Sequence, residues 1–385
     1  MIKQEINELK RLYTPSNCSI TRICGCYVDG EKNKKTEFKE AFLSLPEEEI
    51  FKYFELLRKT LSGSLGKNLL NLDFPLASEQ EGGTQAALLA LRDSKLKDDA
   101  LIEEFYDRVI NTYEYVGNYL ILLIHDAYDV PGKTTDGLTM DDASDTVFEY
   151  IMCCICPVNL SKPGLSYDSI NNEFHNRIRD WVVEMPETGF LFPSFNDRAT
   201  DIHSTLFYSK NPEEAHSEFV ENILGCTLPL SAGTQKEAFQ ALIEETLGDE
   251  VEYVVVKNIH ENLTEMIEEH KEIPEPLTLD KHQVKSLFEK SGVKEEKLTD
   301  FDKLYDAAAG EDTSLFVNNV ANVRTFEVKT PDVVVKVNPE RADLVNTLQI
   351  DGKRCLVIEI NDHVEVNGIT IHQGVSLEDV ADEEE

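Results

Sequence analysis

The spacing of apolar residues predicts helices in the first part of the chain. Helical periodicity is found in four segments, at residues 2–12, 46–61, 84–91 and 98–115. In the second segment Ile50, Phe51, Phe54 and Leu57 define one apolar face. Three glutamates begin that segment and two basic residues end it, which is the charge distribution that a helix dipole favours. We therefore expect an amphipathic helix packed against a core.

Other segments combine β-branched and apolar residues in the manner of strands. Strands are expected at residues 19–28, 118–125, 147–158 and 189–195. Between them, residues 129–145 are rich in Gly, Thr and Asp and are expected to form a long exposed loop. A helix is expected at residues 166–183. This alternation indicates helices and strands arranged around one sheet.

The second half of the chain changes character twice. Residues 234–309 are expected to be mostly helical, with one strand at 252–257. Short β-rich segments follow, and Asp351-Gly352 and Asn367-Gly368 favour hairpin turns between them. We expect an α+β protein with a mixed-sheet core, a helical section, a C-terminal antiparallel β meander and an acidic tail, at residues 1–230, 231–310, 311–376 and 377–385.

Charge restricts the partners of the chain. It has 37 basic and 73 acidic residues, a formal net charge of −36, yet the first seventy residues are nearly balanced, with 12 basic and 10 acidic. Because so negative a field repels nucleic acid and anionic membranes, nucleic acid is expected to bind only through a local surface. The closely spaced lysines of the N-terminal segment are the candidates for binding an acidic partner: Lys32, Lys34, Lys35 and Lys39.

The sequence also predicts a compartment. The longest apolar run, residues 119–124, is too short to span a bilayer, and the N-terminus lacks the apolar stretch of a signal peptide. We expect a cytoplasmic protein with a protein partner, no membrane association and an oligomeric state that the sequence leaves open.

Six of the eight cysteines form two groups, which include Cys24, Cys26, Cys154 and Cys156. Their Cys-x-Cys spacing within expected strands differs from the spacing of structural zinc sites. We therefore favour buried, reduced thiols without a metal or cofactor. A metal site would require the two cysteine strands to be neighbours.

Two polar clusters follow expected strands, where ligand-binding groups are common. Their candidate catalytic residues are His125, Asp126, Asp129, Asp197, Asp201 and His203. If the two strand ends met, these side chains could hold a divalent cation and activate water, or His125 could act as a general base. The alternative, which we favour, is that the aspartates shape turns.

No complete catalytic or cofactor motif is present. Gly63, Gly66 and Lys67 resemble part of a phosphate loop but lack its first Gly and its Ser/Thr. Arg177 and Trp181 could bind phosphate or a base, or could pair with carboxylates and pack in a core. The preferred function is a non-enzymatic interaction or regulatory protein, and the alternative is a metal-dependent hydrolase that uses the His/Asp clusters.

Three segments resemble an uncharacterised bacterial family, the domain of unknown function 4317. They are residues 19–32 (SITRICGCYVDGEK), 156–167 (CPVNLSKPGLSY) and 330–341 (TPDVVVKVNPER). The resemblance extends over nearly the whole chain. It implies a cytoplasmic protein of Gram-positive type and implies no activity.

A looser pattern is similar to the bacterial nucleoid-associated protein family. It consists of a strand and polar turn at residues 189–201 and the segment EFVENILGC at 218–226, followed by helices and a β-rich end. This resemblance implies a link to the nucleoid, and the acidity of the chain argues against broad contact with DNA.

Overall fold

The computed structural model describes residues 1–133, 139–248, 251–322, 325–360, 364–366 and 368–371. Its contacts divide the chain into two compact units. Unit 1 comprises Met1–Ala238, Lys271–Thr278 and Thr313–Asn319. Unit 2 comprises Phe239–His270, Leu279–Asp312 and Val320–Glu385. That domain boundaries lie near residues 230 and 310 stays a prediction.

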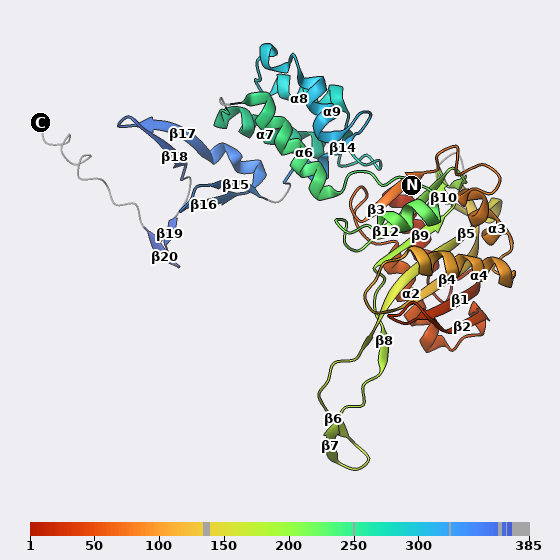
Figure 1. Ribbon diagram of the computed structural model, residues 1–385. Coiled ribbons are helices and arrows are strands. Elements are labelled where there is room, and N and C mark those ends of the chain that lie inside the picture. Colours follow the sequence, from red (N-terminus) through yellow and green to blue (C-terminus); the bar gives the residue numbers. More distant parts are fainter. Residues whose placement is uncertain (134–138, 249–250, 323–324, 361–363, 367, 372–385) are drawn as a thin grey trace, which may run out of the picture. The chain divides into compact units, whose positions relative to one another are not determined.

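Unit 1 is built on one eight-stranded sheet (Figure 1). Its strand order is β2-β1-β4-β5-β9-β12-β3, and β8 pairs with β5 beside this path. All these neighbours are antiparallel, so the sheet that was expected to be mixed is antiparallel throughout. The strands are β1 (Ile20–Val28), β2 (Lys34–Ala41), β3 (Leu69–Asp73), β4 (Asn118–Lys133), β5 (Thr139–Leu160), β8 (Trp181–Val183), β9 (Thr188–Phe192) and β12 (Ser204–Ser209).

Helices cover both faces of this sheet. One buried cluster joins the sheet to α1 (Lys3–Leu12) and α2 (Glu47–Thr60). The other joins it to α3 (Thr84–Asp93), α4 (Asp99–Thr112) and the short helices α5 (Ser217–Phe219) and η2 (Val220–Leu224). The four N-terminal helices and four strands expected from the sequence are confirmed, and the protein is α+β.

Strand alternation assigns the side chains of β4 to the two cores. Ile121 and Leu123 belong to the α3/α4 core, whereas Leu122 and Ile124 belong to the α1/α2 core. All four side chains are fully buried. A strand buried on both faces has a continuous apolar run in place of an alternating one, which explains the sequence YLILLI at residues 119–124.

The prediction of a loop at residues 129–145 is wrong for those residues of the segment that the structure describes. Strand β4 continues to Lys133, and β5 begins at Thr139 and pairs with it in antiparallel register. Register shifts on both sides of Pro131 accommodate the proline within the ladder. Cross-strand pairing therefore overrides the turn-like composition of this segment.

The helix expected at residues 166–183 is also wrong. The segment forms β6 (Leu165–Asp168), β7 (Glu173–Asn176) and β8. Asp168 accepts hydrogen bonds from the backbone nitrogens of Ile170 and Asn171, and Asn172 has a φ of 53°. Such local side-chain bonds compete with helix formation and favour a turn.

Unit 2 combines helices with small hairpins. Its core includes Phe239, Phe288 and Phe301, with ring centroids 6.0 Å apart for the first pair and 5.4 Å for the second. The strand expected at residues 252–257 is a helix instead, because Ile259 and Leu263 lie four residues apart on its buried side. The helices of this region are α7 (Tyr253–Glu269), α8 (Lys281–Lys290) and α9 (Phe301–Ala309), and α6 (Ala232–Leu247) crosses the boundary at residue 238.

The expected C-terminal meander consists of three separate two-stranded sheets. Their strands are β15 (Phe326–Lys329) with β16 (Val334–Val337), β17 (Val345–Ile350) with β18 (Lys353–Ile358), and β19 (Val364–Val366) with β20 (Ile369–Ile371). The expected hairpin turns are confirmed at Asp351, Gly352 and Gly368, whose φ angles are 51°, 73° and 82°. The acidic tail expected at 377–385 lies outside the described residues, as does Asn367.

The remaining elements are short. They are η1 (Phe42–Ser44), β10 (Ser194–Asn196), β11 (Ala199–Asp201), β13 (Thr278–Leu279), η3 (Glu295–Leu298), β14 (Leu315–Phe316), α10 (Val317–Val320) and η4 (Pro339–Leu344).

The β17–β18 turn permits a test of this assignment. A Cβ at Gly352 would meet no atom within 4 Å, so substitution there costs only backbone strain. We expect Gly352→Val to destabilise the hairpin by about 1–2 kcal/mol, the cost of a left-handed conformation for an L-residue. Hydrogen exchange of the β18 amides measures this loss. Gly352→Asn is the matched control and should cost less, because Asn tolerates this conformation. Equal protection in the two variants would contradict the assigned turn.

Candidate functional site

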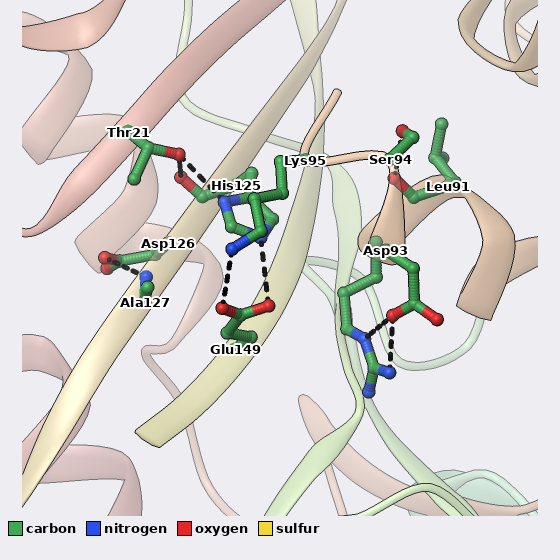
Figure 2. Close-up of polar contacts among 10 residues, drawn as sticks. Thr21, Leu91, Asp93, Ser94, Lys95, His125, Asp126, Ala127 and Glu149 are labelled. Carbon is green, nitrogen blue, oxygen red and sulfur yellow. Dashed lines mark hydrogen bonds and ion pairs between the residues drawn. The ribbon is translucent and has the colours of Figure 1, made fainter. Parts of the chain in front are cut away.

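His125 lies in β4 with its imidazole fully buried (Figure 2). Its Nδ1 shares a 2.8 Å hydrogen bond with the Thr21 hydroxyl. Its Nε2 makes no hydrogen bond with the described residues and lies 4.0 Å from Oε2 of Glu149. Burial lowers the pKa of His125 to about 4, although Glu149 opposes this shift. The imidazole is therefore neutral at pH 7 and closed to a substrate.

Asp126 belongs to a polar network on the other face of the sheet. Its Oδ2 accepts a 2.6 Å hydrogen bond from the Tyr150 hydroxyl, and the backbone nitrogen of Ala127 donates to Oδ1 at 2.8 Å. The hydroxyls of Tyr150 and Tyr13 lie 3.0 Å apart. Burial raises the pKa of Asp126, and the Tyr150 hydrogen bond opposes that rise. This network ties the end of α1 to the centre of the sheet.

The second cluster builds the β10–β11 hairpin. Asp197 and Arg198 occupy its turn, with φ angles of 51° and 56°. Two guanidinium nitrogens of Arg198 contact the carboxylate of Glu8 at 2.9–3.3 Å, and so the turn is held against α1. Asp197 is exposed. This turn therefore links the β10–β11 hairpin to helix α1.

Asp201 and His203 follow the same hairpin. Burial alone raises the pKa of Asp201, but hydrogen bonds from Ser204, the His203 backbone and Asn196 outweigh burial and lower it. The imidazole of His203 pairs with Glu79 at 2.6 Å, which raises the pKa of His203. Both residues thus have partners close to the hairpin.

The two predicted clusters do not form one site. His125 and Asp126 point to opposite faces of the sheet, Asp129 is exposed, and Asp201 and His203 bind other partners. Among the residues that the structure describes, no group of three or more His, Cys, Asp or Glu side chains could hold a metal ion. A hydrolase that uses these residues gains no support from the geometry.

The predicted partner-binding lysines form ion pairs within the chain. Lys32 pairs with Glu114 at 2.7 Å and Lys35 with Asp29 at 2.6 Å. Two of the three lysines of β2 reach helix α4: Lys34 pairs with Glu103 and Asp107, and Lys39 with Asp99. Because carboxylates already neutralise these charges, attraction for a further acidic partner is reduced. Their role in partner binding stays a prediction.

The cysteines of β1 and β5 are separated by β4. Cys24 and Cys26 face the α3/α4 core, whereas Cys154 and Cys156 face the α1/α2 core. These four thiols are fully buried, and burial raises the pKa of each. They pack as small apolar side chains. A metal site shared by the two cysteine groups would require β1 and β5 to be neighbours, and β4 lies between them.

A feature that the sequence patterns did not predict is a two-stranded ribbon, here called the arm, formed by residues 159–183. Figure 1 shows β6 and β7 extending away from the sheet, beyond the ends of β5 and β8. Arg179 donates from Nε to the Ser161 carbonyl at 2.6 Å, and β6 pairs with β7 along four residues. The rings of Tyr167 and Phe174 contact each other across the ribbon, tilted by 49° and with centroids 5.3 Å apart. The arm is therefore an ordered hairpin.

Apolar side chains cover the arm and are exposed to solvent. Nine large ones are exposed: Leu160, Leu165, Tyr167, Ile170, Phe174, Ile178, Trp181, Val182 and Val183. Ile170 is 91% exposed and Phe174 71%. Exposed apolar groups that gather in one place mark interaction surfaces. The signal in the sequence was Asp168 with Asn171 and Asn172, turn-forming residues between two β-rich stretches.

An antiparallel sheet enclosed by helices on both faces, with an arm of exposed apolar side chains, defines an α+β protein. Residues 1–369 match the family model described as "Domain of unknown function (DUF4317)", and the chain belongs to this family. No curated protein matches the chain. The resemblance predicted from three segments is thus confirmed, and that to nucleoid-associated proteins stays a prediction.

In the part of the chain that the structure describes, no helix is long and apolar enough to cross a bilayer.

The buried imidazole predicts a pH dependence of stability. The folded pKa of His125 is about 4 and the unfolded value 6.5, so between these values the unfolded chain binds the extra proton. The free energy of unfolding should therefore fall as the pH falls through this window, by at most about 3 kcal/mol. Urea denaturation at pH 4.5–7.5 measures this, and His125→Gln should reduce the loss but leave the contribution of His216, whose pKa is also lowered by burial.

His203 offers a control of opposite sign. Its folded pKa is raised, so its contribution to stability is present below the unfolded pKa and is lost as the pH rises through the folded pKa. His203→Gln should therefore leave the acid loss in place. If wild type and His125→Gln had the same pH slope, the buried neutral imidazole would be refuted.

Proposed function

We propose that this protein is a non-enzymatic interaction protein, and that its arm binds the arm of a second copy. The observation that carries the proposal is the exposure of nine large apolar side chains on one ordered hairpin. A two-stranded hairpin is marginally stable alone in water. Contact with a second apolar surface removes these side chains from water and stabilises the ribbon.

Charge favours protein over nucleic acid as the partner. The arm contains three basic residues (Lys162, Arg177, Arg179) and three acidic ones (Asp168, Glu173, Asp180). A balanced surface lacks the excess of positive charge that phosphate backbones require. The net charge of −36 adds repulsion of nucleic acid and of anionic membranes.

The same balance favours a second copy of this chain. Two bodies of such negative charge repel each other, but arms that carry equal numbers of both signs do not. Residues 160–168 extend at most roughly 30 Å, which exceeds the Debye length of about 8 Å at physiological salt. A contact at the ends of two arms therefore keeps the acidic bodies apart. Under two-fold symmetry, the basic residues of each arm can face the acidic residues of the other.

The proposal places the protein in the bacterial cytoplasm, where its eight free cysteines stay reduced. Regulation through a partner, or through the nucleoid, is compatible with an arm that assembles copies of the chain. Neither is required for the contact between arms.

Ile170→Asp tests the proposed assembly. Burying an isoleucine contributes about 1.5–3 kcal/mol. In a two-fold interface the substitution occurs twice, so we expect the dimer dissociation constant to rise about 100-fold or more. Sedimentation velocity over a range of protein concentrations measures this change, and circular dichroism checks that the core remains folded.

Leu76→Asp is the matched control. Leu76 is 81% exposed and lies outside the arm, so this variant should sediment as wild type does. A wild-type protein that is monomeric at tens of micromolar would overturn the proposal, as would equal effects of the two substitutions. A dimer that nuclease treatment dissolves would assign the arm to nucleic acid instead.

A further inference from the structure

The ends of α1 and α2 form a second feature, which lies outside the arm and outside the predicted clusters. Arg58 of α2 donates from its guanidinium to the carbonyl of Tyr13, the residue that caps the end of α1. Conversely, Lys10 of α1 donates to the Ser62 hydroxyl just beyond α2, at 2.8 Å. Each helix thus supplies a cation to the end of the other.

An open surface depression of about 620 Å³, here called the cavity, lies at these ends. Its lining consists of Asn7, Lys10, Arg11, Thr14, Asn17 and Arg58. Every lining side chain is polar, three are cationic, and none is a carboxylate. This composition is the reverse of that of the whole chain, in which acidic residues outnumber basic ones by 73 to 37.

The cations of this cavity lack acidic partners. Among the described residues, no ion pair involves Lys10, Arg11, Arg58 or the adjacent Lys59. The nearest acidic residues of the two helices are engaged elsewhere, since Glu8 pairs with Arg198 and Glu55 with Lys52. Burial, followed by the charges of Arg58 and Lys59, lowers the pKa of Lys10, as expected where positive charges gather.

The cations at this cavity exceed the number needed to neutralise the negative ends of the two helix dipoles. Each helix C-terminus has about half a negative charge, so two ends together offset roughly one of the three positive charges of the lining. A net charge of about +2 therefore remains at the cavity. The Arg58 guanidinium lies 6.0 Å from the centre of the buried Phe54 ring, which limits its freedom to turn toward solvent.

We propose that this cavity binds a small phosphate-bearing anion. Arginine and lysine nitrogens supply charge-assisted hydrogen bonds to phosphate oxygens, and the Asn and Thr side chains add neutral donors. The volume falls within the usual range for small-molecule sites. Because no aromatic side chain lines the cavity, stacking on a nucleobase is absent, and the favoured ligand is a hydrophilic phosphate ester or pyrophosphate.

Isothermal titration calorimetry with sodium pyrophosphate, at an ionic strength fixed with NaCl, tests the site. Arg11→Gln is the main variant, because Arg11 is exposed and its side chain has no described contact that the fold requires. Arg58→Gln is the second variant and also removes the hydrogen bond to Tyr13. Each should weaken pyrophosphate binding at least tenfold.

Lys52→Gln is the matched control, since it removes the same charge from α2 at a residue paired with Glu55 outside the cavity. It should bind pyrophosphate as wild type does. Absence of binding to wild type at millimolar pyrophosphate would overturn the proposal, and so would equal weakening in all three variants. Co-sedimentation with phosphatidic acid vesicles, without binding of free pyrophosphate, would assign the cavity to a lipid headgroup and refute the free ligand.

Discussion

Burial of the central strands on both faces is the constraint on which the rest of unit 1 depends. Along β4 and β5, successive side chains enter opposite cores, and both cores are apolar and closed by helices. This period of two sends Cys153 and Cys154 to different faces, and it does the same to His125 and Asp126. Neighbours in the sequence therefore become parts of separate environments.

A sheet enclosed in this way leaves little of its polar chemistry accessible. The imidazole of His125 has no exposed surface, and the carboxylate of Asp126 is engaged by Tyr150. Their hydrogen bonds join α1 and the neighbouring strands. The two surfaces for which we propose binding lie outside the enclosed sheet, on the arm and at the ends of α1 and α2. The arm is apolar and balanced in charge, whereas the cavity is cationic in an acidic chain.

Much of the fold could be predicted from periodicity and from helix ends. Helix α2 has its glutamates, its basic residues and its buried Phe54 and Leu57 where the pattern predicted them, whereas Phe51, predicted on the same face, is 45% exposed. Segment 166–183 and the described residues of segment 129–145 were assigned wrongly because their structure depends on cross-strand pairing, which local composition does not specify. The separation of His125 from Asp126 could have been predicted from the sequence, since strand alternation places adjacent residues on opposite faces. The cavity could not have been predicted, because Arg11 and Arg58 come together only when two helices pack.

In the proposed dimer, the arm of one copy is covered by the arm of the other. Trp181 is the single tryptophan of the chain and lies on the arm, 56% exposed, so its fluorescence reports on this surface alone. The direct measurement is its emission maximum between nanomolar and tens of micromolar protein. If the arms of two copies pair, the emission maximum of Trp181 should shift to shorter wavelength as the protein concentration rises, because the indole leaves water. An emission maximum that stays at the solvent-exposed wavelength over this whole range would contradict it.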